Sequence, residues 1–280
     1  MALHISKKAA AVSPSPTLSI DAKFKEMKAK GVPVVGFDSG VPDAPAGIIV
    51  STASTNNYAA GALAAEKMFA SPPVKMRLGM ASSASPVCVG VLSQDTTSSS
   101  IQGRTKGFLD KFKELSESIH PGAVEITGHP EYTRPCAELP AVYLNVTIPS
   151  TPEYTDAQNA ARRLLKDTPQ LIGLFCSNEG TVTGLLAATN EGEDLDRKTG
   201  AYRDLIVIGF DAGAPQKSAV RKQQFYGSIT QDPYQIGYLA VQLAYKAAKG
   251  ESVDAVADTG CKFYTHENID SPDISQLVYD

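Results

Sequence analysis

Hydrophobic runs alternate with segments of helical periodicity along most of the chain. Alternation of this kind is typical of parallel sheets with helices on both faces, so the pattern predicts an α/β fold. Strands are predicted near Ala9–Val12, Val34–Phe37, Val87–Leu92, Val142–Val146, Ile172–Cys176 and Leu205–Phe210. Helices are predicted near Ile20–Lys30, Asn57–Phe69, Ser98–Leu115, Thr155–Leu165, Gly180–Thr189 and Pro233–Ala248.

Two stretches of the chain are nearly the same. "VPVVGFDSG" at Val32–Gly40 and "DLIVIGFDAG" at Asp204–Gly213 share a hydrophobic run that ends in Gly-Phe-Asp-x-Gly. A Tyr-x-x-Gly-x-Leu-Ala segment follows each of them, beginning at Tyr58 and at Tyr234. Gly and Ala at such spacing would let any helix pack closely, but two matched segments in the same order favour a repeated unit of strand, turn, short strand and helix.

Length and composition narrow the class of protein. A chain of 280 residues favours two lobes, and 42% hydrophobic with 20% charged residues is ordinary for a globular protein. The net charge of −4, without a cluster of Lys and Arg interleaved with aromatic residues, argues against nucleic acid as a partner. The opening "MALHISKKAA" lacks the apolar core of a signal peptide, and the chain has no apolar run of about 18 residues.

The cysteines and histidines do not suggest a metal site. Cys88 and Cys176 fall inside predicted strands, where a small buried thiol is expected. A disulfide between Cys136 and Cys261 is possible, but the sequence leaves it open. The segment from Ser116 to Pro140, which is rich in Pro, Gly and His, is interpreted as a long loop in which His120 and His129 contribute polarity.

Catalytic signatures are missing from the sequence. It contains no G-x-S-x-G, H-E-x-x-H, phosphate-binding G-x-x-x-x-G-K-[ST] or post-strand G-x-G-x-x-G motif. All four histidines fall in predicted loops or near a terminus, so no general base is placed beside a nucleophile. The sequence therefore does not support an enzyme.

Polar residues gather instead where the predicted strands end. Open α/β sheets bind ligands at the carboxyl ends of their strands. Carboxylates, amides and a guanidinium together offer planar, bidentate hydrogen bonds, which match the neighbouring hydroxyls of a sugar better than an anion. The candidate residues at or just beyond these strand ends are Asp38, Gln94, Asp95, Arg104, Asn178, Asp211 and Gln231.

Each of these candidates also has a structural interpretation. An Asp at a strand end can cap the following turn, and Asn178 can be the N-cap of its helix. Arg104 alone could be a solvated helix residue. Their combination at one edge of two related lobes favours a binding site.

In these residues and the segments around them, the chain resembles the type I periplasmic sugar-binding proteins of ABC transporters. The resemblance is closest to the ribose-binding group, which is related to the effector domains of LacI-type repressors. The matching segments are "GVPVVGFDSG", "QGRTKGF", "FCSNEGTVTGLLAA", "VIGFDAGAPQKSAV" and "GSITQDPYQIGYLAVQLAYKAAKGE", in the order of the family.

The resemblance implies two Rossmann-like lobes with parallel sheets, joined by a hinge of three crossing strands. The N-terminal lobe would comprise residues 1–70 and 232–257, and the C-terminal lobe residues 71–231 and 258–280. We expect the N-terminal lobe to be incomplete, because the family's opening strand, helix, strand and helix has no counterpart here. The resemblance also assigns ligand contacts to Asp38, Arg104, Asn178, Asp211 and Gln231, with Tyr154 as a looser candidate.

The function implied is that of a monomeric, extracytoplasmic receptor. It would deliver a monosaccharide or polyol to ABC permease subunits without a cofactor. Ser39 stands where ribose binders carry Arg, so the resemblance does not specify ribose. Two alternatives stay open: the sugar-sensing domain of a repressor, and an enzyme that modifies sugars.

Overall fold

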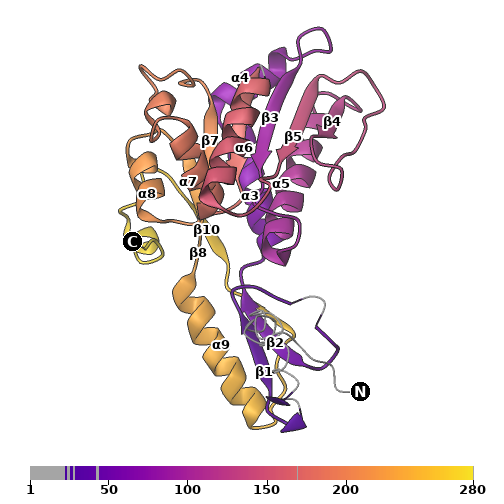
Figure 1. Ribbon diagram of the computed structural model, residues 1–280, viewed down its shortest axis with the longest axis vertical. Coiled ribbons are helices and arrows are strands. Elements are labelled where there is room, and N and C mark those ends of the chain that lie inside the picture. The colour runs from indigo at the N-terminus through magenta and orange to yellow at the C-terminus, as the bar shows by residue number, and fades with distance from the viewer. Residues whose placement is uncertain (1–22, 24–25, 28, 42–43, 169, 280) are drawn as a thin grey trace, which may run out of the picture.

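A computed structural model shows two lobes of unequal size (Figure 1). It describes residues 23, 26–27, 29–41, 44–168 and 170–279. The large lobe contains a seven-stranded sheet of order β10-β8-β7-β6-β3-β5-β4, and the small lobe a three-stranded sheet of order β1-β2-β9. The expected α/β fold with parallel-dominated sheets is confirmed.

The elements of the two lobes are as follows. The small lobe holds β1 (Val34–Phe37), β2 (Ile49–Ser54), β9 (Val256–Asp258) and α9 (Pro233–Ala248). The strands of the large lobe are β3 (Val87–Leu92), β4 (Val124–Thr127), β5 (Val142–Thr147), β6 (Leu171–Cys176), β7 (Ile206–Phe210), β8 (Gly227–Gln231) and β10 (Cys261–Tyr264). Its helices are α3 (Asn57–Ala70), α4 (Pro72–Met80), α5 (Ser99–Glu117), α6 (Tyr154–Asp167), α7 (Glu179–Ala188), the 3-10 turn η1 (Glu193–Leu195), α8 (Ala214–Arg221) and α10 (Pro272–Ser275).

The large sheet is parallel except for β10, which runs antiparallel to β8. Central strands such as Val87–Leu92 are hydrophobic throughout and buried at every position. That pattern is expected where helices cover both faces of a parallel sheet. Residues of α3, α4 and α5 form one core cluster with the sheet, and residues of α6, α7 and α8 form a second.

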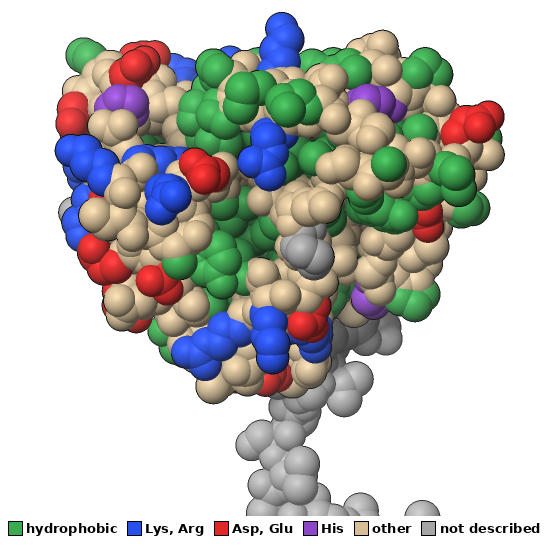
Figure 2. Space-filling view, turned by 90° about the horizontal axis from the view of Figure 1, so that it is seen from above, with side chains coloured by type: hydrophobic (Ala, Val, Ile, Leu, Met, Phe, Trp, Pro, Cys, Tyr) green, Lys and Arg blue, Asp and Glu red, His purple; other side chains and the backbone are tan. Residues whose placement is uncertain are grey.

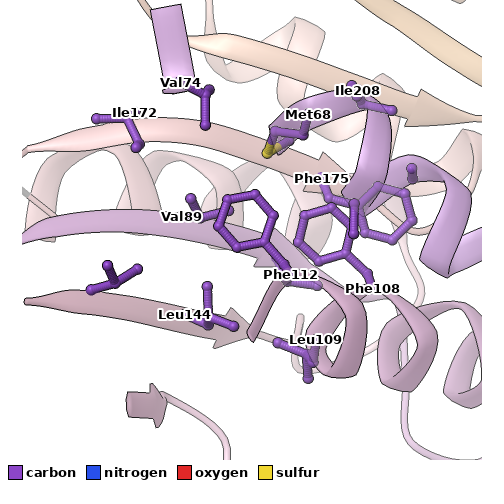
Figure 3. Packing of buried hydrophobic residues seen from close by; sticks show 14 of the residues in the cluster. Met68, Val74, Val89, Phe108, Leu109, Phe112, Leu144, Ile172, Phe175 and Ile208 are labelled. Atoms are coloured by element: carbon purple, nitrogen blue, oxygen red, sulfur yellow. The ribbon is translucent and has the colours of Figure 1, made fainter. Parts of the chain in front are cut away.

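Aromatic rings organise the first of these cores (Figure 3). The rings of Phe108 and Phe175 stack with centroids 4.6 Å apart, and Phe112 lies next to Phe108 at 5.6 Å. Met68 of α3 covers Gly173 of β6, where a Cβ would lie 2.5 Å from its sulfur. These contacts press α3 and α5 onto the sheet.

The small lobe has much less interior than the large lobe. Among the residues that the structure describes, both hydrophobic clusters belong to the large lobe, and the buried apolar side chains of the small lobe are few, such as Ile48, Ile236 and Leu243. One face of α9 packs on β1 and β2, while Tyr234, Tyr238, Val241 and Tyr245 on another face are exposed. Within the described residues, no helix is both long and apolar enough to span a membrane.

Three segments connect the lobes. The chain crosses after β2 at residues 55–56, after β8 at residue 232 and after β9 at residues 259–260. Two of these crossings are hydrogen-bonded to each other: the Thr55 hydroxyl donates to the Gly260 carbonyl, and the Thr259 N–H donates to the Ser54 carbonyl. The expected three-segment connection between two lobes is therefore present.

The sequence repeat has a clear structural meaning. In each copy, a strand ends in Gly-Phe, an Asp follows it, and a second parallel strand comes next, after α8 in the second copy. The chain then crosses to the other lobe, where the Tyr-x-x-Gly helix begins. The first copy gives α3 and the second gives α9. Gly61 of α3 is buried against α5, where a Cβ would lie 2.0 Å from the carbonyl oxygen of Arg104. Its counterpart Gly237 of α9 is exposed, and no described residue lies within 4 Å of where its Cβ would be.

This crossing corrects the expected lobe boundary. Residues 57–70 were assigned to the lobe of the first copy, but α3 packs on α5 and on strands of the large sheet. The reason is that the chain crosses at Thr55–Asn56, before the helix begins, and Gly61 fits only where α5 approaches closely.

Most of the predicted elements are confirmed within a few residues. The predicted strand Ala9–Val12 lies outside the described residues. Of the predicted helix Ile20–Lys30, residues 23, 26, 27, 29 and 30 are described; the first four are helical and Lys30 is in a turn. The segment from Ser116 to Pro140 is not purely loop, because β4 pairs with β5 at the edge of the sheet. Short elements such as β4, α8 and β9 were missed because their hydrophobic pattern covers too few residues.

The cysteines lie where the strand pattern predicts, and the possible disulfide is excluded. Cys88 and Cys176 are buried in central strands. All four thiols are free, and the possible Cys136–Cys261 disulfide is not formed. Cys261 lies in β10 at one edge of the sheet, whereas Cys136 contacts Glu125 of β4 at the opposite edge.

We predict that the two repeat glycines respond oppositely to alanine. Gly61→Ala should lower the free energy of unfolding by about 3 kcal/mol, because the backbone of α5 blocks the new methyl group. Gly237→Ala should raise it by up to about 1 kcal/mol, since alanine is the better helix former at an open position. Urea unfolding of both variants beside the parent chain measures this, and equal effects would contradict the packing described for α3.

Candidate functional site

The carboxyl ends of the parallel strands in the large sheet face the small lobe (Figure 1). Asp211 follows β7, Asn178 lies just past β6, and Gln231 is the last residue of β8. Asp38 follows β1 of the small lobe at the corresponding strand end. The repeat thus places its two aspartates at the same position of two related sheets.

Both aspartates have an unusual backbone conformation. The φ angle is 65° at Asp38 and 76° at Asp211, a left-handed region that side chains other than Asn and Asp rarely adopt. In each copy the aspartate N–H donates to a carbonyl of the next parallel strand, Ala53 for Asp38 and Ile229 for Asp211. Such local strain, maintained in both lobes, is typical of functional positions.

The backbone carbonyl of Asp211 is held by three buried side chains. Tyr264 Oη donates to it at 2.9 Å, Gln216 Nε2 at 3.0 Å and Ser228 Oγ at 3.1 Å. These donors come from β10, α8 and β8. The left-handed turn at Asp211 is therefore fixed by tertiary contacts from three elements.

The carboxylate of Asp211 accepts from two neighbours. Gln231 Nε2 donates to Oδ1 at 3.0 Å, and the N–H of Glu179 donates to Oδ2 at 3.1 Å. Arg104 Nη1 lies 3.8 Å from Oδ2. Three predicted site residues, Asp211, Gln231 and Arg104, are thus in direct contact.

Arg104 is buried rather than solvated, with 5% of its surface exposed. Its guanidinium lies 3.7 Å from the centre of the Phe210 ring. Nε donates to Asn57 Oδ1 at 2.8 Å, and Nη1 donates to the Ser177 carbonyl at 3.0 Å. Burial lowers the pKa of the guanidinium, and the negative charges of Asp211 and then Asp38 oppose that shift.

The small lobe reaches this cluster through the turn after β1. The hydroxyls of Ser39 and Ser100 are 3.1 Å apart, and Ser99 Oγ donates to the Gly40 carbonyl at 3.3 Å. These bonds join the small-lobe turn to the start of α5. The carboxylate of Asp38 has no recorded hydrogen bond or ion pair with a described residue, and Arg104 is within reach of its charge.

Asn178 caps helix α7, and Asp95 caps the turn that precedes α5. Asn178 accepts from the N–H of Thr181 in a capping box and donates to Gln94. Asp95 Oδ1 accepts from the N–H groups of Thr97 and Ser98, just before α5. Burial opposes the ionisation of Asp95, but these hydrogen bonds outweigh it and hold its pKa below the usual value. Both side chains therefore have the capping role that their positions in the sequence suggest.

Tyr154, a predicted site residue, lies apart from the cluster. Two residues of the cluster, Glu179 and Tyr279, were not predicted from the sequence. Tyr154 begins α6 and is half-exposed, and no contact recorded among the described residues joins it to Arg104 or Asp211. Glu179 begins α7 with its carboxylate against Gly213, and Tyr279 lies close enough to hydrogen-bond it. Glu179 could have been suspected from its place beside Asn178, but nothing local distinguishes Tyr279.

Glu179 and Asp211 are neighbouring carboxylates. Burial and then the charge of Asp211 raise the pKa of Glu179, while a hydrogen bond from Tyr279 acts in the opposite direction. Burial, followed by the same two carboxylates, also raises the pKa of Tyr279 to about 12. The site is consequently an acidic environment around one guanidinium.

The best-defined cavities lie elsewhere. Those of about 250 and 370 Å³ open at the amino ends of β6 and β7, on the side of the large lobe away from the small lobe. On that side Lys and Arg are interspersed with Asp and Glu (Figure 2). Within the described part of the chain, no three His, Cys, Asp or Glu residues are arranged to hold a metal ion.

Comparison with known proteins agrees with this architecture. A model of the periplasmic binding protein domain matches residues 7–252. The ribose import binding protein RbsB of Salmonella typhimurium is 31% identical over 107 residues, which is 38% of this chain and 33% of that protein. RbsB of Bacillus subtilis is 24% identical over 113 residues, 40% of this chain and 34% of that protein. The match thus spans about a third of the length of these relatives.

Solved structures match over most of the chain. An "ABC transporter, LacI family transcriptional regulator" from Brachyspira murdochii has a TM-score of 0.77 and 36% identity, covering 92% of this chain and 76% of its own. A solute-binding protein from Agrobacterium vitis with bound D-fucose has a TM-score of 0.68 and 24% identity, covering 92% and 74%. A match to an aminotransferase of Aquifex aeolicus covers only 32 residues, 11% of the chain.

We predict that Tyr264→Phe loosens the turn at Asp211. Removal of the buried hydroxyl takes away one of three donors to the Asp211 carbonyl and should lower the free energy of unfolding by about 1 kcal/mol. Tyr245→Phe, at an exposed position of α9, is the matched control and should have no effect. Chemical denaturation of both variants tests this, and equal stability would argue against the role of Tyr264.

We also predict that Glu179→Gln stabilises the protein at pH 7.5. The folded-state pKa of Glu179 is raised, so its ionised form disfavours folding above that pKa. The advantage of glutamine should therefore fade as the pH falls through the folded pKa towards the ordinary glutamate value of about 4.3. Melting temperatures at pH 7.5 and pH 4 measure this. Glu251→Gln, an exposed control, should show no such pH-dependent gain.

Proposed function

Because the chain belongs to the periplasmic binding protein domain family, we propose that it binds a small sugar or polyol between its two lobes as the solute receptor of an ABC importer. The whole function is a proposal, since the match covers about a third of the curated relatives. The observation that carries it is the convergence of Asp38, Arg104 and Asp211 from two lobes.

The binding chemistry follows from the groups present. Carboxylate oxygens of Asp38 and Asp211 can accept from sugar hydroxyls, and the amides of Gln231 and Asn178 can donate or accept. Hydrogen bonds to charged groups contribute about 1.5 to 3 kcal/mol each. Several of them can leave about 8 kcal/mol, a micromolar affinity, after the cost of association.

Ligand binding would act on the relative position of the lobes. A ligand that touches Asp38 on one side and Asp211 on the other favours the closed arrangement, because only that arrangement provides both sets of contacts. Rotation about the three connecting segments would allow closure. The bonds from Ser39 and Gly40 to the start of α5 would form in the same step.

The partners implied are the permease subunits of an importer, and the location is extracytoplasmic. Both rest on the family and on the ribose import relatives. A second candidate, the sugar-sensing domain of a repressor, is favoured by the Brachyspira murdochii structure, whose description names the LacI family. Turnover of a sugar would instead indicate an enzyme; the aminotransferase matches are too short to support one.

The test is a calorimetric panel of pentoses, hexoses and alditols on the full chain. We expect at least one saturable ligand, whose affinity falls at least about tenfold in both Asp38→Asn and Asp211→Asn. Asparagine is chosen because it tolerates the left-handed backbone at these positions. Asp270→Asn, an exposed surface substitution, is the control and should bind normally.

Two outcomes would overturn the proposal. One is a folded protein that binds nothing across the panel. The other is a ligand whose affinity is unchanged by both substitutions, which would place its site elsewhere in the molecule.

A further inference from the structure

The charges and hydrogen-bond acceptors around Arg104 point to a narrower ligand class. Resting on the proposed function, we propose that the interlobe site prefers a sugar that carries a protonated amine over the neutral sugar of the same ring, and excludes acidic sugars. Three features of the site favour a cationic ligand: its net negative charge, its unpaired acceptors, and the carboxylates beside its helix N-termini.

The local charge is negative. Asp38, Asp211 and Glu179 contribute three carboxylates, and Glu179 donates its N–H to Asp211, so two of the three are adjacent. Among the described residues, Arg104 is the only cation recorded in an ion pair with any of them. One guanidinium beside three carboxylates leaves a surplus of negative charge.

Arg104 is also poorly placed to attract an anionic ligand. Its Nε and Nη1 donate to Asn57 and Ser177, and its plane lies over Phe210. With Nε and Nη1 held by the protein and Asp211 beside Nη1, much of the charge of Arg104 is already compensated. Its charge instead partly balances Asp211.

The site contains acceptors without a recorded donor. Gln231 Oε1 is buried without a hydrogen bond in the described structure, because the amide nitrogen of the same side chain is directed at Asp211. The Asp38 carboxylate has no recorded donor among the described residues. A hydroxyl brings a donor together with acceptors, whereas an ammonium group brings three donors and no acceptor.

Helix N-termini often bind anions, but carboxylates lie next to both helix N-termini at this site. The Asp95 carboxylate accepts from the N–H groups of Thr97 and Ser98, just before α5, and so places a negative charge near that helix N-terminus. At α7, the Asn178 side chain takes the N–H of Thr181, and Glu179 adds a negative charge in the first turn. A sugar acid or sugar phosphate would meet like charges there.

The experiment is calorimetry on the full chain with three matched probes, namely glucosamine, glucose and glucuronate, and with the corresponding galactose series. At pH 6.5 we expect the amino sugar of at least one series to bind about tenfold more tightly than its neutral sugar. The acid should show no saturable binding. The advantage of the amine should shrink at high salt, because it depends on charge.

Two variants show where any preference arises. Glu179→Gln should reduce the ratio of amino-sugar to neutral-sugar affinity at least about threefold while both sugars still bind. Glu251→Gln, a distant exposed carboxylate, should leave the ratio unchanged.

The possible failures can be told apart. Binding of neutral sugars with equal or weaker binding of the amines, or saturable binding of an acid, overturns this inference and leaves the sugar receptor standing. No binding of any probe or panel sugar overturns the proposed function and this inference together. A ratio unchanged in Glu179→Gln would remove the assigned electrostatic cause and overturn the inference as argued.

Discussion

The buried guanidinium of Arg104 is the contact on which the rest of the site depends. Removing such a charge from water costs several kcal/mol, so it must be paired and hydrogen-bonded. Asn57 at the start of α3, Ser177 after β6 and Asp211 after β7 supply those partners, and Phe210 covers its plane. One side chain therefore fixes the relative position of a helix and two strand ends.

The backbone of the same residue limits how α3 can pack. Gly61 lies against the carbonyl of Arg104 so closely that no side chain fits. The repeated helix α9 has the same glycine, but nothing recorded lies against it, and its neighbours Tyr238 and Val241 are exposed. The two repeated helices thus differ in what packs against them among the described residues. Among the described residues, both hydrophobic clusters lie in the large lobe.

The candidate site combines rigid and adaptable parts. Asp211 is held by three donors to its carbonyl and two to its carboxylate, all from the large lobe. Asp38 sits on the small lobe, which reaches the large lobe here through hydroxyl contacts at Ser39 and Gly40. A preorganised half facing a half that can move is well suited to capture a ligand by closure, because little ordering is required on the fixed side.

The sequence by itself determined the parallel α/β class, most of the long elements and the two Gly-Phe-Asp strand ends. It could do so because strands buried on both faces are continuously hydrophobic, and because each repeat keeps its turn residues. The tertiary structure decided where those elements lie and which residues they bring together. It placed α3 in the opposite lobe, separated Cys136 from Cys261, and added Glu179 and Tyr279 beside Asp211. These outcomes depend on where the chain crosses between lobes and on contacts between distant residues, which no local pattern specifies.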